Sequence, residues 1–186
     1  MSILVSPLSH VADLVARRRP GRVISALDPD SEFPALGPRY AGRHLRLAFH
    51  DAHVPALGVT PPSPLHLAEL LAFLDRWDAS ESLLVHCRAG IGRSTAIAYV
   101  SACYRNPRAS ELEIASALRR AAPLARPNEA IVRLADAAME REGRMASAIV
   151  ETGRGLGWIL VNEGFPFEMP SRFHPRTKRA SDPSVA

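Results

Sequence analysis

The spacing of hydrophobic residues alternates along the chain between a strand-like period and a helix-like period. Short apolar runs, or apolar residues at every second position, predict strands. They lie at 3–5, 22–27, 45–49 and 83–85, and the first is predicted to be an edge strand. Apolar residues three or four positions apart predict helices. These cover 10–19, 64–74, 93–105, a segment after 110, and 129–138, with an extension to 149 left open. Strands that alternate with helices predict an α/β fold, with a mostly parallel central sheet flanked by helices.

Four of the predicted helices begin after a residue that can cap them. The side-chain oxygens of Ser9, Ser63, Ser110 and Asn128 can each accept a hydrogen bond from a backbone N–H group of the first turn. Pro64 stands at the first helical position, where a proline sacrifices no hydrogen bond. The helix at 93–105 is apolar nearly all round, so it is predicted to be central and buried.

Length and charge favour one domain followed by a tail. The 186 residues, 47% of them hydrophobic, suit a single folded domain, which we predict at 1–164. Prolines and charges return from residue 165, so 165–186 is predicted to be a basic, flexible tail. The net charge is +4, but 171–186 hold four cations and one anion, which leaves +1 for the rest. The basic balance therefore describes the tail and predicts no nucleic-acid partner.

Two cysteines are too few for a disulfide scaffold or a structural zinc site. The first residues lack the charged start and long apolar core of a signal peptide. No apolar stretch approaches the ~20 residues of a membrane span. We therefore predict a cytoplasmic protein without stable membrane association.

The stretch 85–95, VHCRAGIGRST, lies between a predicted buried strand and a predicted helix start. Backbone N–H groups converge in such a loop, and the helix N-terminus adds positive potential, so an anion site is predicted over residues 87–93, the anion loop. Gly90 and Gly92 permit the tight backbone path. The planar guanidinium of Arg93 can bind two phosphate oxygens at once. The positive surroundings favour a thiolate on Cys87, which is the nucleophilic form.

The run HCRAGIGRS, from His86 to Ser94, resembles the Cys-x5-Arg-Ser/Thr signature of the cysteine-dependent protein tyrosine phosphatase superfamily. The compact size resembles its small dual-specificity-like branch, in particular bacterial members. The resemblance implies that Cys87 is the nucleophile, that Arg93 binds the phosphate and stabilises the transition state, and that Ser94 assists the leaving sulfur. It implies that His86 orients the loop. The phosphoryl oxygens would be held by the backbone N–H groups of Arg88, Ala89, Gly90, Ile91, Gly92 and Arg93.

The reaction also needs a general acid, because an alkoxide or phenolate is a poor leaving group. The resemblance implies an aspartate on a loop after the strand that precedes the signature region. Asp51 follows the strand predicted at 45–49 and stands 36 residues before Cys87. Asp28 and Asp30 follow an earlier predicted strand and stay open as alternatives.

Metal and disulfide chemistry receive little support from the sequence. His50 and His53 flank Asp51, but no third ligand is evident, so they are predicted to be loop histidines that at most contact substrate. Cys103 lies about ten residues into the predicted helix, which is ~15 Å from the anion loop and beyond the reach of a disulfide to Cys87. We predict that Cys103 packs in the core and that the protein uses no metal and no other cofactor.

The resemblance therefore implies a phosphomonoester hydrolase that forms a phosphocysteine. Phosphotyrosine in a protein or peptide is the first predicted substrate, with phosphoserine and phosphothreonine as alternatives. A phosphoinositide or inositol-phosphate phosphatase on the same fold stays open. Loops of that kind often carry lysines, whereas only Arg88 adds charge here. A catalytically silent phosphate-binding module and an enzyme that handles sulfur or arsenate are further alternatives. The intact Cys87, Arg93 and Ser94 argue against the first, and the spacing of the loop argues against the second.

Overall fold

The computed structural model describes residues 2–153 and 162–175. Its centre is a five-stranded sheet in the order β3-β2-β4-β1-β5. The strands are β1 (Ser2–Pro7), β2 (Arg22–Leu27), β3 (His44–Ala48), β4 (Leu83–Cys87) and β5 (Phe167–Pro170). The first four run parallel to their neighbours, and β5 pairs antiparallel with β1. The predicted mostly parallel α/β fold is confirmed.

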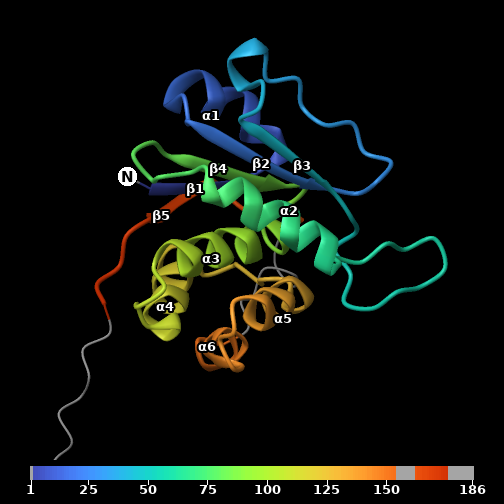
Figure 1. Ribbon diagram of the computed structural model, residues 1–186. Coiled ribbons are helices and arrows are strands. Elements are labelled where there is room, and N and C mark those ends of the chain that lie inside the picture. The colour runs from blue at the N-terminus through green and yellow to red at the C-terminus, as the bar shows by residue number, and fades with distance from the viewer. Residues whose placement is uncertain (1, 154–161, 176–186) are drawn as a thin grey trace, which may run out of the picture.

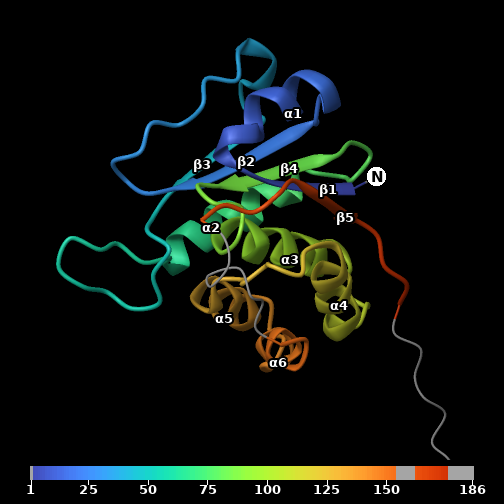
Figure 2. The ribbon, with the colours of Figure 1, turned by 180° about the vertical axis from the view of Figure 1, so that it is seen from behind.

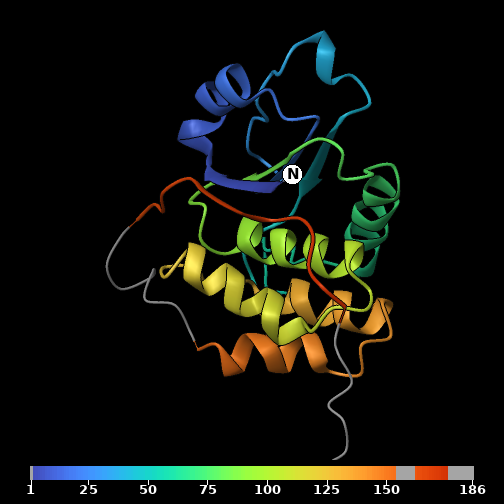
Figure 3. The same cartoon turned by 90° about the vertical axis from the view of Figure 1, so that its left-hand side faces the viewer.

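Helices cover the two faces of the sheet unequally (Figures 1 and 3). Among the described residues, one face carries α1 and the other carries five further α-helices. α3 packs directly against β4 and β1, while α4, α5 and α6 form an outer layer. The helices are α1 (Val11–Arg18), α2 (Pro64–Asp75), α3 (Arg93–Arg105), α4 (Glu111–Ala121), α5 (Glu129–Ala138) and α6 (Arg144–Glu151). Every residue of α3 from Arg93 to Cys103 is buried, so its predicted central position is confirmed.

Three of the four predicted caps are confirmed. Each accepts a hydrogen bond from the backbone N–H group three residues on: Ser63, Ser110 and Asn128. The prediction for Ser9 is wrong, because α1 begins at Val11 with His10 as its N-cap and without a side-chain capping bond. A 3₁₀ turn over Leu8–His10 leads into α1, so the hydroxyl of Ser9 lies one residue too early to cap it.

The extension of the last predicted helix to 149 as one continuous helix is also wrong. α5 ends at Ala138, and α6 begins after Gly143, which has a φ of +82°. The carboxylate of Asp136 accepts hydrogen bonds from the backbone N–H groups of Gly143 and Met145, both at 2.6 Å. Asp136 near the end of α5 thus caps the start of α6, and the chain turns between the two helices.

The C-terminal segment corrects two predictions at once. β5 adds to the outer side of β1, so β1 lies between two strands and is not an edge strand. Residues 167–170 belong to the sheet, and Met169 is 1% exposed, so the domain boundary predicted at 164 is too early. The apolar residues Phe167 and Met169 alternate with polar or proline neighbours over only four positions, too short a pattern to stand out. The remainder of the predicted tail, from 176, lies outside the described residues.

The parallel strands bring three loops together at one edge of the sheet. β2, β3 and β4 all end at this edge, where α3 begins. Asp28 follows β2, Asp51 follows β3 shortly after its end, and the anion loop follows β4. The long segment between β3 and α2 projects outward from this edge (Figures 1 and 2). In parallel α/β sheets ligands bind outside the carboxyl ends of the strands, so the topology itself points to this edge.

Candidate active site

Four carbonyl groups of the anion loop are bonded to three distant parts of the chain. The donors are the backbone N–H groups of Leu8 to Arg88 (3.1 Å), Gly164 to Ala89 (2.8 Å), Arg126 to Ile91 (2.9 Å) and Asn128 to Gly92 (3.3 Å). Because a trans peptide directs its N–H opposite to its C=O, the N–H groups that follow these carbonyls turn toward the inside of the loop. The loop is therefore a cup of N–H groups at the N-terminus of α3, which is an arrangement that binds anions.

Gly90 shows why the loop needs glycine. Its φ is +72°, in the left-handed region that other residues adopt at a cost. A Cβ atom at this position would lie 2.7 Å from the backbone nitrogen of Pro7 at the end of β1. The N–H group of Gly90 donates to Cys87 Sγ at 3.2 Å. The turn thus directs a backbone donor at the sulfur.

Cys87 lies at the base of this cup, at the last position of β4. Its side chain is buried, and Sγ lies 3.1 Å from the hydroxyl oxygen of Ser94 in the first turn of α3. A thiolate accepts hydrogen bonds and makes none as a donor, so these two contacts suit the ionised sulfur. Ser94 is itself fully buried, and the sequence had singled it out for this contact.

His86 is held from behind by a chain of polar side chains. Its Nε2 shares a hydrogen bond with the hydroxyl of Ser25 on β2, and the same hydroxyl lies 2.7 Å from Nε2 of His44 on β3. Burial lowers the pKa of His86 from 6.5 to about 4, and His44 adds to this effect. Burial, with a contribution from Arg46, also lowers the pKa of His44 to about 4. Both rings are therefore neutral at neutral pH. Nothing in the sequence pattern indicated this chain.

The guanidinium of Arg93 is fixed at one nitrogen and open at another. The Nη1 group donates to Asp28 Oδ1 at 2.9 Å and to the carbonyl oxygen of Phe49 at 2.6 Å. The ends of β2 and β3 thus hold the side chain, which is only 4% exposed. The Nε–H group is buried and has no hydrogen-bond partner among the residues the structure describes. A buried donor without a partner is unfavourable, and a bound oxyanion would satisfy it.

The three predicted acids differ in their surroundings. Asp28 is the counterion of Arg93, and Asp30 is exposed in the turn that follows. Asp51 reaches the anion loop, because a Cβ atom on Gly92 would overlap its carboxylate at Oδ2. The other oxygen of Asp51, Oδ1, accepts a hydrogen bond from Asn128 Nδ2 at 2.6 Å. The structure therefore places Asp51 over the loop and gives Asp28 a different partner.

The segment that carries Asp51, residues 50–62, is attached mainly at its ends. The backbone N–H of His50 donates to Thr60 at 2.7 Å, and the N–H of Thr60 donates back to His50 Nδ1 at 3.0 Å. His50 is thus occupied within the segment. His53 is exposed, and farther out Leu57 is fully exposed.

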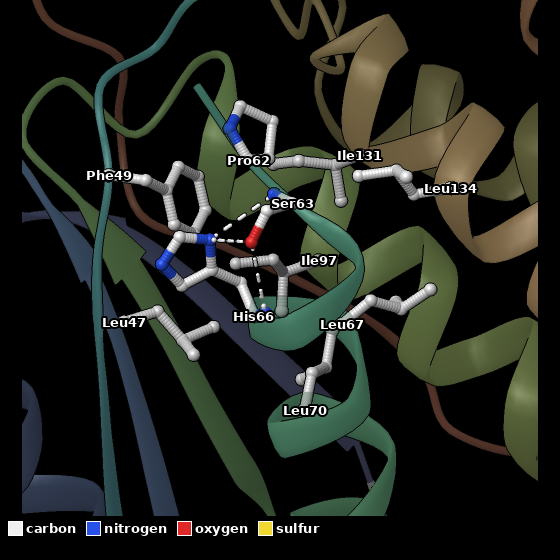
Figure 4. A pocket seen from close by; sticks show the side chains of 10 residues that line it. All are labelled: Leu47, Phe49, Pro62, Ser63, His66, Leu67, Leu70, Ile97, Ile131 and Leu134. Carbon is white, nitrogen blue, oxygen red and sulfur yellow. Dashed lines mark hydrogen bonds between the residues drawn. The ribbon is translucent and has the colours of Figure 1, made fainter. Parts of the chain in front are cut away.

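A small apolar cavity lies beneath the ends of this segment (Figure 4). Phe49 packs there against the ring of His66, with ring centroids 5.0 Å apart, and His66 in turn bonds the capping residue Ser63. The remaining lining side chains are Pro62 of the segment itself and residues of β3, α2, α3 and α5. The volume is only about 10 Å³, too small for an organic ligand, so this is a packing feature that anchors the segment.

A cavity of about 490 Å³ opens beside the anion loop. Asp51, His53, Ile91 and Gly92 line one side of it, and Arg126 and Asn128 lie among the residues that close it. The mixed polar and apolar lining is suited to a substrate that carries both an anion and an organic group.

Three further observations concern the cysteines, metal binding and membrane spans. Cys87 and Cys103 are both free thiols, as predicted, and burial raises the pKa of Cys103 to about 12. Within 2–153 and 162–175, no three His, Cys, Asp or Glu side chains lie together so that they could hold a metal ion. No helix in the same ranges is long and apolar enough to cross a membrane.

Comparison with known proteins identifies the fold. The model of the protein-tyrosine phosphatase family matches residues 49–125. Among solved structures, human DUSP28 is 19% identical over 75% of this chain and 92% of its own, with a TM-score of 0.54. PTPMT1 is 18% identical over 78% of this chain and 94% of its own, with a TM-score of 0.54. DUSP15 is 20% identical over 81% of this chain and 87% of its own, with a TM-score of 0.53.

At these identities the solved structures show a shared fold. No curated protein matches the sequence significantly. The family model covers the anion loop and Asp51, and the neighbours share the architecture that brings the two together. Residues 49–125 are thus similar to the protein-tyrosine phosphatase family, and the chain has the α/β fold of small dual-specificity phosphatases.

Proposed function

We propose that this protein hydrolyses phosphomonoesters, with phosphotyrosine in proteins or peptides as the preferred substrate, through a phosphocysteine on Cys87. One observation carries the proposal. The buried Nε–H of Arg93 lacks a partner among the described residues, next to a cup of backbone N–H groups with Cys87 Sγ at its base. A phosphate dianion would supply the acceptors that these donors need.

In the first step the Cys87 thiolate attacks phosphorus in line with the leaving oxygen. The backbone N–H groups from Arg88 to Arg93 bind the non-bridging oxygens, and Arg93 binds them through its planar fork. Asp51 donates a proton to the leaving oxygen as the P–O bond breaks. In the second step water attacks the phosphocysteine and gives a proton to the Asp51 carboxylate. The S–P bond breaks, and the hydroxyl of Ser94, 3.1 Å from Sγ, stabilises the departing thiolate.

His86 positions the loop and takes no part in proton transfer. Its lowered pKa keeps the ring neutral, and the contact with Ser25 holds it in place. No cofactor is needed in this scheme, because the loop and Arg93 supply the positive potential. We further propose a cytoplasmic enzyme that acts on phosphorylated proteins, with no nucleic-acid partner and no stable membrane association.

A substrate panel tests the proposal. The wild-type protein and Cys87→Ser are assayed with an aryl phosphate, with peptides carrying phosphotyrosine, phosphoserine or phosphothreonine, and with inositol phosphates and phosphoinositides. We expect the highest kcat/KM on phosphotyrosine peptides. Cys87→Ser should lose at least ~10³-fold in rate while still binding inorganic phosphate, because the N–H cup and Arg93 remain.

Three results would contradict the proposal in different ways. A near-normal rate for Cys87→Ser would exclude the phosphocysteine. Phosphate binding without turnover of any substrate by the wild type would mean a silent binding module. A preference for phosphoinositides would mean that the fold and mechanism are right and the substrate class is wrong.

A further inference from the structure

Asn128 connects three parts of the candidate site. Its side chain is buried, its Oδ1 accepts the N–H of Ile131 at 3.1 Å as the cap of α5, and its Nδ2 donates to Asp51 Oδ1 at 2.6 Å. Its backbone N–H donates to Gly92 in the anion loop at 3.3 Å. Its sequence position predicted only the capping role. The contact with Asp51 joins residues 77 positions apart.

The capping bond fixes which way the amide of Asn128 faces. Oxygen is the only side-chain atom that can accept the N–H of Ile131, so the NH₂ group must face Asp51. The two oxygens of Asp51 are therefore not equivalent. Oδ1 receives the amide donor, while Oδ2 lies against Gly92 of the anion loop.

A protonated carboxyl group carries its hydrogen on one oxygen only. The oxygen that accepts a hydrogen bond from an N–H group is favoured as the carbonyl oxygen, because a hydroxyl hydrogen there would oppose the N–H donor. The acidic proton of Asp51 is then directed to Oδ2, the oxygen next to the anion loop.

We propose that Asn128 is a positioning residue that directs the acidic proton of Asp51 to Oδ2, facing the leaving oxygen of a phosphate bound in the anion loop. This inference rests on the proposed function. In the step it serves, the electron pair of the Cys87 thiolate forms the S–P bond and the bond from phosphorus to the leaving oxygen breaks. The leaving oxygen takes the proton from Asp51 Oδ2, and the resulting carboxylate keeps its bond to Asn128.

Other charged groups face the same space and remain in every variant below. His53, Arg119, Arg126 and Glu129 line the cavity with Asp51. Arg119 donates to the carbonyl oxygens of Ala125 and Gly153, both at 2.7 Å, and so is committed to the backbone. A change confined to residue 128 therefore isolates the amide donor from this background.

Asn128→Asp separates the two roles of the side chain. Aspartate caps a helix as well as asparagine does, so the bond to Ile131 is kept. The donor to Asp51 is lost, and a second carboxylate takes its place. Asn128→Ser, which also keeps a capping oxygen but adds no carboxylate, tests the leaving-group dependence alone if the aspartate variant fails to fold. Ser110→Ala is the matched control, because it removes the equivalent capping bond from α4.

The experiment measures kcat against pH for a series of aryl phosphates with leaving groups of different acidity, together with thermal unfolding. We expect Asn128→Asp to lower kcat by at least ~10-fold for poorly acidic phenols and hardly at all for strongly acidic ones, which need no proton. The alkaline limb should move to higher pH, because a second carboxylate favours the protonated acid. Ser110→Ala should lower Tm and leave the pH profile and the leaving-group dependence unchanged.

The outcomes are distinguishable. Suppose that Asp51→Asn lowers kcat most for poorly acidic leaving groups, while Asn128→Asp changes neither kcat nor its dependence on the leaving group. The role of Asn128 is then refuted, and Asp51 is still the general acid. If Asp51→Asn has no such effect, Asp51 is not the acid and this inference fails with it. If the wild type hydrolyses none of the aryl phosphates, the proposed function itself is refuted.

Discussion

The anion loop and the segment 50–62 meet at the same site, but they are held in opposite ways. Four carbonyl groups of the anion loop are bonded to three separate parts of the chain, and its Arg93 and Cys87 are buried. The segment 50–62 is closed by a pair of bonds between His50 and Thr60 and is exposed over most of its length. A rigid cup can present its donors in advance of the substrate. The exposed segment carries Asp51, which the bond to Asn128 holds beside the loop.

The largest effect is expected from a change in the anion loop. Arg93→Lys keeps the charge but removes the planar fork, and a lysine cannot satisfy both Asp28 and a phosphate. We expect a loss of at least ~10²-fold in kcat. Steady-state kinetics on an aryl phosphate measures it. A loss below tenfold would mean that Arg93 does not stabilise the transition state.

The second change acts on the exposed segment 50–62. Asp51→Asn should lower kcat by roughly 10²-fold and remove the fall in rate on the alkaline limb, because no proton remains to be lost. Asp28→Asn should keep the bell-shaped profile and raise KM, because Asp28 holds Arg93 and lies away from the leaving oxygen. The pH dependence of kcat in both variants shows which aspartate is the general acid. A flattened profile in Asp28→Asn with an intact one in Asp51→Asn would reverse the two roles.

Low pH should lower the folding stability of the protein through His86, which is buried beneath the anion loop. His86 has a pKa of about 4 in the folded protein, against 6.5 for an unburied histidine. Between these values the unfolded chain binds a proton that the folded chain does not, so stability falls as pH drops below 6.5 and the fall levels off near pH 4. At pH 5 the contribution of His86 is a loss of about 2 kcal/mol relative to pH 8. Denaturant unfolding of wild type and His86→Gln at both pH values measures it, and equal pH slopes would contradict it.

Two glycines with nearly the same φ sharpen the comparison further. Gly90 in the anion loop has a φ of +72° and Gly58 in the segment has a φ of +71°. A Cβ atom on Gly90 would meet Pro7, whereas one on Gly58 would meet nothing within 4 Å. Alanine at either position strains the backbone, so the excess loss in Gly90→Ala, roughly 1–2 kcal/mol, reports packing alone. Equal losses in free energy of unfolding would mean that the loop is no more tightly packed than the segment.

The same contrast explains what could be predicted from the sequence. The anion loop is contiguous, so Cys87, Arg93 and both glycines are visible as one motif between a strand and a helix. Helix starts at Ser63, Ser110 and Asn128 are local patterns as well, and all three are confirmed.

The features that the sequence does not reveal all depend on distant contacts. The ion pair between Asp28 and Arg93, the bond between Asn128 and Asp51, and the partners of His86 join residues 61 to 77 positions apart. The pairing of β5 with β1 is equally remote, and it reversed the prediction of an edge strand. Spacing along the chain carries no information on which strand ends meet.

The central claim is that phosphate passes through Cys87, and one measurement tests it directly. Ser94→Ala removes the hydroxyl that lies 3.1 Å from Sγ and should slow the second step more than the first. With excess aryl phosphate, rapid mixing should give a burst of about one phenol per protein molecule. Mass spectrometry after acid quench should then find the phosphate on Cys87. Turnover of the same variant with no burst and no phosphate on Cys87 would contradict the account.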